Sequence, residues 1–166
     1  AGLVIESIGG SGNPLSTDAD SDFVRLLKVA SQLGAPAITT GSGGSPTTKG
    51  LEAFIEIAKA ITPIARNLNV RLSIKPHVRS AVHSTPTALR LMEEVDQEWI
   101  GLNFDASHLW RATPPEVPEE SAKTLAPFII TARIRDTLSH ESAIGAVETQ
   151  IPGGGAMNLP AIAAAL

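Results

Sequence analysis

Two kinds of apolar segment alternate along the chain. Short, β-branched runs predict strands, and these fall over residues 3–8, 36–41, 70–77, 99–105 and 129–135. Segments with apolar residues every three or four positions predict helices, over 21–34, 51–68, 84–95, 118–128 and 158–166. Pro63 lies inside the second of these and is expected to kink or split it. Ser21 or Asp20 is expected to cap the first helix, which Gly34 ends.

This alternation predicts an α/β fold with parallel strands joined by right-handed crossovers. An open doubly wound sheet and a (β/α)8 barrel both fit the order of elements. The turn "IGGSGNP" after the first strand lacks the glycine fingerprint of a nucleotide-binding sheet. In "GSGGSPTTKG", Lys49 precedes Gly50, the reverse of a phosphate-binding loop. The barrel is therefore favoured.

Polar residues follow the third and fourth predicted strands where each one ends. In "LSIKPHVRS", Lys75 and His77 are two positions apart, so on a strand they point the same way. In "NFDASHLW", Asp105 ends a strand and His108 follows three residues later. An aspartate and a histidine so placed can bind a divalent metal or a sugar hydroxyl, although on spacing alone a turn cap at Asp105 and a solvated His108 are the commoner explanation. In a barrel these strand ends share one rim.

The fifth predicted strand ends in "ARIRD". Arg133 and Arg135 alternate with Ile134 and should share a face, and Asp136 follows them. Two guanidinium groups in one pocket suit a phosphate or carboxylate, which makes Arg133, Arg135 and Asp136 candidate substrate-binding residues. An internal network of ion pairs with Asp105 and Asp136 explains the same residues equally well.

Composition excludes several classes of protein. A net charge of −4 without a run of Lys or Arg argues against a nucleic-acid groove or an anionic membrane surface. Absence of cysteine excludes disulfides, thiolate nucleophiles and Cys-based zinc sites, and is compatible with a cytoplasmic location. No apolar run approaches the roughly 18 residues that span a bilayer. The partner expected is therefore a small molecule.

Several segments resemble the xylose isomerase-like TIM barrels, the sugar phosphate isomerase/epimerase family related to endonuclease IV. These are "ASQLGAPAITTGSGG", "VRLSIKPH", "WIGLNFDASHL", "IITARIRD" and "GGGAMNLPAIAAAL". The resemblance implies one TIM-barrel domain over residues 1–166, of which about five of the eight units are present, so a portion of the barrel is expected. Members of the family typically bind a divalent metal through two glutamates, an aspartate and a histidine, and use it to polarise a ketose.

Carried over by position, the resemblance makes Asp105 the metal aspartate and His108 the histidine that contacts substrate. His77 matches the histidine two places after the first metal glutamate. That glutamate is replaced by Lys75 and the metal histidine by Arg133. Two cations repel a metal and cannot ligate it while protonated, but they can neutralise an oxyanion in its place. A lysine beside an arginine can also have a lowered pKa and act as a base or Schiff-base amine.

These residues predict a sugar or sugar-phosphate isomerase/epimerase-like protein with a lost or altered metal site. Lys75, His77, Asp105 and His108 are the candidate catalytic residues. The cofactor is none, or a weakly bound Mn²⁺, Mg²⁺ or Zn²⁺ at Asp105. The alternative is a non-catalytic barrel that binds an anionic small molecule, and the sequence leaves open whether the chain is an enzyme. A zinc-dependent DNA-repair nuclease is disfavoured by four histidines and the negative net charge. A homo-oligomer is compatible with the sequence.

Overall fold

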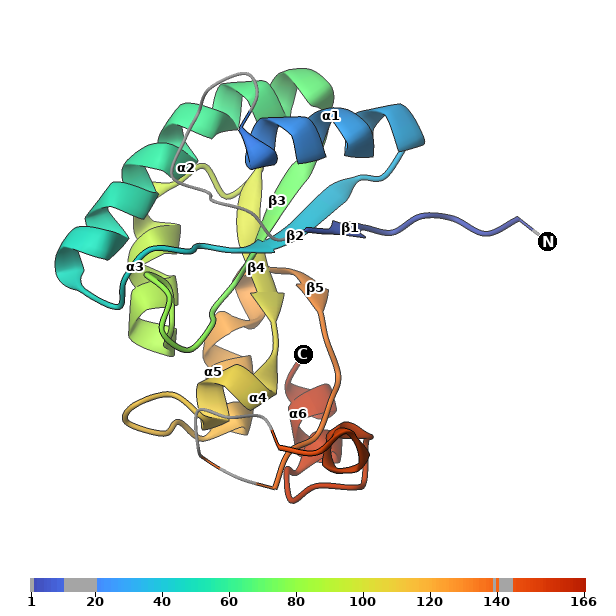
Figure 1. The fold of residues 1–166 in the computed structure, drawn as a ribbon, viewed down its shortest axis with the longest axis vertical. Helices are drawn as coiled ribbons and strands as arrows, with labels where there is room; N and C mark the ends of the chain where they lie inside the picture. The colour runs from blue at the N-terminus through green and yellow to red at the C-terminus, as the bar shows by residue number, and fades with distance from the viewer. Residues whose placement is uncertain (1, 11–20, 139, 141–144) are drawn as a thin grey trace.

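The computed structural model describes residues 2–10, 21–138, 140 and 145–166. Five parallel strands form one sheet whose order follows the chain (Figure 1). They are β1 (Ile8–Gly9), β2 (Ala37–Gly41), β3 (Arg71–Lys75), β4 (Ile100–Phe104) and β5 (Ile129–Ala132). A doubly wound sheet reverses its strand order, whereas a barrel adds each strand beside the last. The fold is therefore a partial (β/α) barrel of about five units, as the sequence predicted.

The helices follow the strands and pack against their neighbours in chain order (Figure 1). They are α1 (Asp22–Leu33), α2 (Thr48–Leu68), α3 (Thr85–Glu94), α4 (Ala106–Trp110), α5 (Pro118–Leu125) and α6 (Leu159–Ala165), with 3₁₀ turns η1 (Ala126–Phe128) and η2 (Val147–Gln150). Ser21 caps α1 by accepting the Val24 N–H, and Gly34 ends it in the left-handed region. Asp20, the other expected cap, lies outside the described residues. No helix in the described part of the chain has both the length and the apolar character to cross a membrane.

Helix α2 is one continuous helix over 21 residues, so of the kink or split predicted at Pro63 the split is wrong and the kink stays a prediction. The Thr62 hydroxyl donates to the Ala58 carbonyl at 2.8 Å inside the same turn. Ile61 and Ala65, on either side of the proline, are almost fully buried in the core. Burial of the apolar face on both sides therefore outweighs the hydrogen bond that the proline cannot donate.

Strand β1 corrects a second prediction, that of a strand over residues 3–8. It pairs with β2 only at Ile8 and Gly9. Leu3 and Val4 are 95% and 89% exposed. A β-branched run becomes a strand only where a partner strand takes its backbone hydrogen bonds, and β2 offers that pairing to two residues alone. The fifth strand is also shorter than predicted, ending at Ala132, although the Arg133 N–H still donates to the Phe104 carbonyl at 2.8 Å.

The two faces of the sheet differ in chemistry. Leu72 and Ile74 of β3, with Ile100, Leu102 and Phe104 of β4, are buried in the apolar core against the helices. The intervening residues point to the other face, the inside of the partial barrel. Because paired residues of parallel strands share a face, the register of Thr39 with Ser73 and of Gly41 with Lys75 extends this inner surface across β2 and β3.

Candidate functional site

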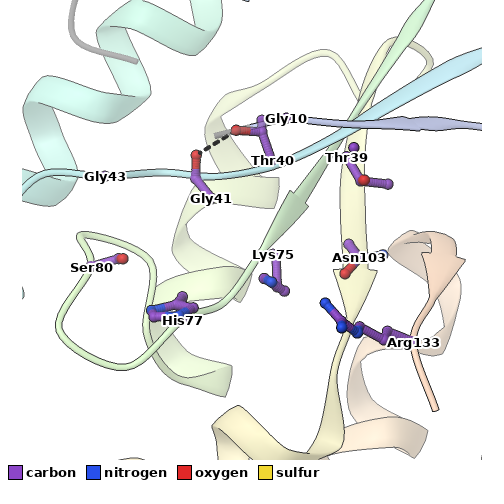
Figure 2. Close-up of a pocket in the computed structure, with 11 residues that line it drawn as sticks. Gly10, Thr39, Thr40, Gly41, Gly43, Lys75, His77, Ser80, Asn103 and Arg133 are labelled. Carbon is purple, nitrogen blue, oxygen red and sulfur yellow. Dashed lines mark hydrogen bonds between the residues drawn. The ribbon is translucent and has the colours of Figure 1, made fainter. Parts of the chain in front are cut away.

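A cavity of about 540 Å³ opens at the C-terminal ends of the strands (Figure 2). Eleven residues line it, from five parts of the chain: Gly9, Gly10, Thr39, Thr40, Gly41, Gly43, Lys75, His77, Ser80, Asn103 and Arg133. Of the residues expected at the site, the cavity is lined by Lys75, His77 and Arg133. None of its lining side chains is an aspartate or glutamate, within the part of the chain that the structure describes.

The inner face below this cavity is polar, where barrel interiors are usually filled by Val, Ile and Leu. The Ser73 and Thr131 hydroxyls are 2.7 Å apart, and Asn103 Nδ2 donates to Thr131 Oγ1 at 2.6 Å. All three side chains are more than nine-tenths buried, and Asn103 also lines the cavity. Together with Thr39 they form a hydrogen-bonding floor. The only sequence signal for this floor was a polar residue inside an apolar strand, as at Asn103 in "IGLNF".

Lys75 ends β3 and points into the cavity toward the side from which Arg133 enters (Figure 2). Its ammonium group forms no hydrogen bond or ion pair within the described residues, and the same holds for the Arg133 guanidinium. Burial lowers the pKa of Lys75 below its usual value, and the nearby charges of Arg133 and Arg135 act in the same direction, while Asp105 opposes them. The part of the cavity wall that the structure describes thus contains two cations and no carboxylate.

His77 lies just beyond β3 and lines the cavity with its ring (Figure 2). Its Nδ1 is 2.7 Å from the Val78 carbonyl, which makes Nδ1 the protonated nitrogen of the neutral ring. Burial lowers the pKa of His77, and the positive charges of Lys75 and Arg111 lower it further. The hydrogen bond to the Val78 carbonyl and the charge of Asp105 act in the opposite direction but do not outweigh them. The ring is therefore neutral near pH 7, and Nε2 is left as a proton acceptor.

Asp105 follows β4 but its side chain is fully buried and does not line the cavity. Oδ1 accepts hydrogen bonds from the Ser107 hydroxyl at 2.7 Å and from Arg135 Nε at 3.2 Å. Oδ2 lies 3.0 Å from Arg135 Nη2 as an ion pair, but lacks a hydrogen bond of good geometry within the described residues. The carboxylate is thus neutralised by Arg135, which forms the internal ion pair that was one of the two interpretations, whereas Arg133 lines the cavity. Contact of Arg135 with substrate remains a prediction.

His108 is in the short helix α4, which the sequence did not predict, and is only 3% exposed. Arg135 Nη2 lies 2.6 Å from its Nε2 and Arg111 Nη2 lies 3.1 Å from its Nδ1. A neutral imidazole accepts only one of these hydrogen bonds, and the shorter contact assigns that role to Nε2. Burial first, and then the positive charges around it, lower the pKa of His108 to about 2. Its ring packs against His77, with centroids 4.0 Å apart.

Two arginines contact His108, and the sequence analysis identified only one of them, Arg135. Arg111 was missed altogether, since "LWRAT" carries no motif that marks it, and it also donates to the Ser107 carbonyl at 3.0 Å. Five residues that do not line this cavity form one hydrogen-bonded cluster, and His108 of this cluster contacts the His77 ring: Asp105, Ser107, His108, Arg111 and Arg135. We call it the buried cluster.

Asp136 is 1% exposed and orders the backbone of a loop. Its Oδ1 accepts the Thr137 and Met157 N–H groups at 2.9 and 3.1 Å, and its Oδ2 accepts the Gly153 N–H at 3.0 Å. Burial acts to raise the pKa of Asp136, but the N–H donors outweigh it and hold the pKa below its usual value. Both oxygens are thus committed to the chain itself. Its predicted contact with substrate remains a prediction.

The donor set that the described residues offer at the cavity does not fit a divalent metal. Within the described residues no three side chains of His, Asp or Glu are arranged to hold an ion. Asp105, the expected ligand, is paired with Arg135 and does not line the cavity, whereas Lys75 does. The positive charges of Lys75 and Arg133 would repel a metal ion in this cavity.

The family model of the xylose isomerase-like TIM barrel matches residues 3–166. The chain belongs to this family. No protein in the curated set matches it significantly.

Solved structures of similar fold include a probable 3-DHS dehydratase, AsbF, from Bacillus anthracis, which is 20% identical with a TM-score of 0.74 over 95% of this chain and 64% of that one. An L-ribulose 3-epimerase is 18% identical, with a TM-score of 0.73 over 96% of this chain and 57% of that one. The IolI protein with a bound zinc atom is 18% identical, with a TM-score of 0.71 over 95% of this chain and 62% of that one. The chain therefore spans less than two thirds of the length of these three proteins, and the likeness to them shows the fold.

Proposed function

We propose that the protein is an isomerase- or epimerase-like enzyme that acts on a sugar or sugar phosphate without a metal in this cavity. The observation that carries the proposal is that Lys75, Arg133 and His77 line one cavity at the C-terminal ends of the strands. In a TIM barrel this is the end at which catalytic residues gather. Similar folds occur in an L-ribulose 3-epimerase and a D-tagatose 3-epimerase-like protein, which supports a carbohydrate substrate.

The chemistry proposed is proton transfer beside a carbonyl group. His77 Nε2 removes the proton from the carbon next to the ketose carbonyl, and the electron pair moves onto the carbonyl oxygen to form an enediolate. Lys75, whose ammonium group has three N–H donors, stabilises the negative charge that develops there. Return of this proton to the former carbonyl carbon, while the hydroxyl proton moves to the other enediolate oxygen, gives isomerisation. Epimerisation requires protonation of the same carbon from its opposite face, and the donor proposed for it is the Lys75 ammonium group, after which proton exchange with solvent restores Lys75 and His77.

The buried cluster acts through His77 rather than on the substrate. The His108 ring packs against the His77 ring, and Arg135 donates a hydrogen bond to His108 and forms an ion pair with Asp105. We therefore propose positioning roles for Asp105 and His108, in place of the direct catalytic and metal-binding roles that the sequence predicted.

The test is exchange of the substrate C–H proton with D₂O, followed by NMR over a panel of ketoses and their phosphates. Exchange is expected with excess EDTA present, and Lys75→Met or His77→Gln should slow it about a hundredfold. Arg25→Met is the matched control, since it removes an exposed positive charge on α1, away from the cavity. Loss of exchange with EDTA and its recovery with Mn²⁺ would refute the metal-free mechanism.

A second candidate is the non-catalytic barrel that binds an anionic small molecule. It is favoured by the burial of Asp105 and His108, which leaves His77 as the one imidazole or carboxylate side chain lining the cavity among the described residues. Binding of a sugar phosphate without any exchange across the panel would favour this candidate over the enzyme.

A further inference from the structure

The described walls of the cavity carry an excess of positive charge. Lys75 and Arg133 contribute two positive charges to its walls, and no carboxylate lines it within the described residues. Asp105, the nearest acid in the buried cluster, is paired with Arg135. This excess of positive charge occurs in a chain whose net charge is −4, so it is a local feature of the site.

Unpaired cations in a partly buried site have a free-energy cost that an anionic ligand removes. Lys75 is half-buried and its pKa is lowered by that burial and by Arg133. An oxyanion placed between the two groups would accept hydrogen bonds from both and reverse this repulsion. A guanidinium can hold a carboxylate or phosphate through two N–H groups, while the ammonium acts as a point charge.

The floor of the cavity has the opposite character, being neutral and hydrogen-bonding. Thr39 and Asn103 line it without contributing charge, and Asn103 is fixed from behind by Thr131. Hydroxyl groups can both donate to and accept from such side chains. The cavity therefore has a cationic region and a hydroxyl-binding region, and its volume of about 540 Å³ is in the range of small-molecule sites.

We infer that the ligand is an anionic polyhydroxy compound, either a sugar acid or a sugar phosphate. Its carboxylate or phosphate lies between Lys75 and Arg133, and its hydroxyl groups lie on the floor at Thr39 and Asn103. This narrows the substrate class within the proposed function and rests on it only for the reaction, because the binding can be measured without turnover.

Calorimetry at constant ionic strength tests the inference with three probes: inorganic phosphate, D-gluconate and the neutral polyol D-glucitol. Phosphate and D-gluconate should bind, and D-glucitol at least tenfold more weakly than D-gluconate. Lys75→Met and Arg133→Met should each weaken phosphate and D-gluconate at least tenfold, whereas Lys75→Arg should retain binding and Arg25→Met should change nothing. Stronger binding of D-gluconate than of phosphate identifies the carboxylate as the preferred anion, and the reverse identifies the phosphate.

The isosteric variant Thr39→Val separates the two regions of the cavity. It should weaken D-gluconate several-fold and leave phosphate unchanged. Binding of D-glucitol equal to that of D-gluconate, or phosphate binding that survives both Met substitutions, would overturn the inference. If neutral ketoses undergo deuterium exchange while neither anion binds, the inference fails but the proposed function stands. If the anions bind as expected without any exchange, the inference holds and the enzyme proposal fails.

Discussion

Replacing Asp136 with Asn gives the sharpest test of whether this residue orders the chain or binds substrate. Its Oδ1 accepts the backbone N–H groups of Thr137 and Met157, and its Oδ2 accepts that of Gly153. The Gly155 N–H is a further backbone donor to this carboxylate. An asparagine of the same shape can keep its oxygen toward the first two. Its amide NH₂ then faces the Gly153 N–H, so that two donors oppose each other.

The free energy of unfolding should fall by about 3 kcal/mol. Loss of one hydrogen bond to a charged acceptor costs about 1.5–3 kcal/mol, and the buried Gly153 N–H left without a partner adds about 1–3 kcal/mol, although the two overlap. The carboxylate pKa lies below its usual value in the folded protein. Its contribution is therefore present above the unfolded pKa and is lost as the pH falls through the folded pKa.

Urea denaturation of the wild type and of Asp136→Asn at pH 7 and pH 3 measures this difference. Glu52→Gln on the exposed face of α2 is the control, with an expected change within about 0.5 kcal/mol. The stability gap between wild type and Asp136→Asn should narrow at pH 3. A gap below about 1 kcal/mol at pH 7, together with weakened ligand binding, would refute the structural role and support the substrate contact.

Three further changes test the packing and the buried cluster. Gly101→Ala should lower the free energy of unfolding by about 1–3 kcal/mol, because the added Cβ would lie 2.6 Å from the Phe128 carbonyl oxygen. An unchanged midpoint of urea denaturation would contradict the close approach of β4 and β5. Phe54→Ala should cost about 3–5 kcal/mol, since this side chain is 1% exposed, while Phe54→Leu should cost much less; equal losses would argue against a tightly packed site. His108 has a pKa lowered to about 2 in the folded protein, so its neutral form contributes stability that is lost as the pH falls below about 6.5, by up to about 2 kcal/mol at pH 5. His108→Gln should remove this part of the pH dependence between pH 7 and 5, and an unaltered slope would show that His108 titrates normally.

The sequence by itself determined the alternation of elements and the cations at strand ends. Periodicity identifies helices and buried strands because it reflects which face of each element is covered, and that face is encoded locally. Lys75 and His77 were assigned to the cavity on their spacing along one strand, and they do line it. The same local reasoning failed at residues 3–8, where a strand needs a partner along its whole length. At Pro63 it left both a kink and a split open, and burial on both sides keeps the helix from splitting.

Only the tertiary structure decided which polar residues meet. Arg133 and Arg135 were indistinguishable in sequence. In the structure Arg133 lines the cavity, whereas Arg135 pairs with Asp105, 30 positions earlier in the chain. The polar floor likewise joins Ser73 to Thr131 across 58 positions. Such pairings depend on the register and curvature of the sheet, which bring distant strand ends together. No pattern within a single segment carries that information.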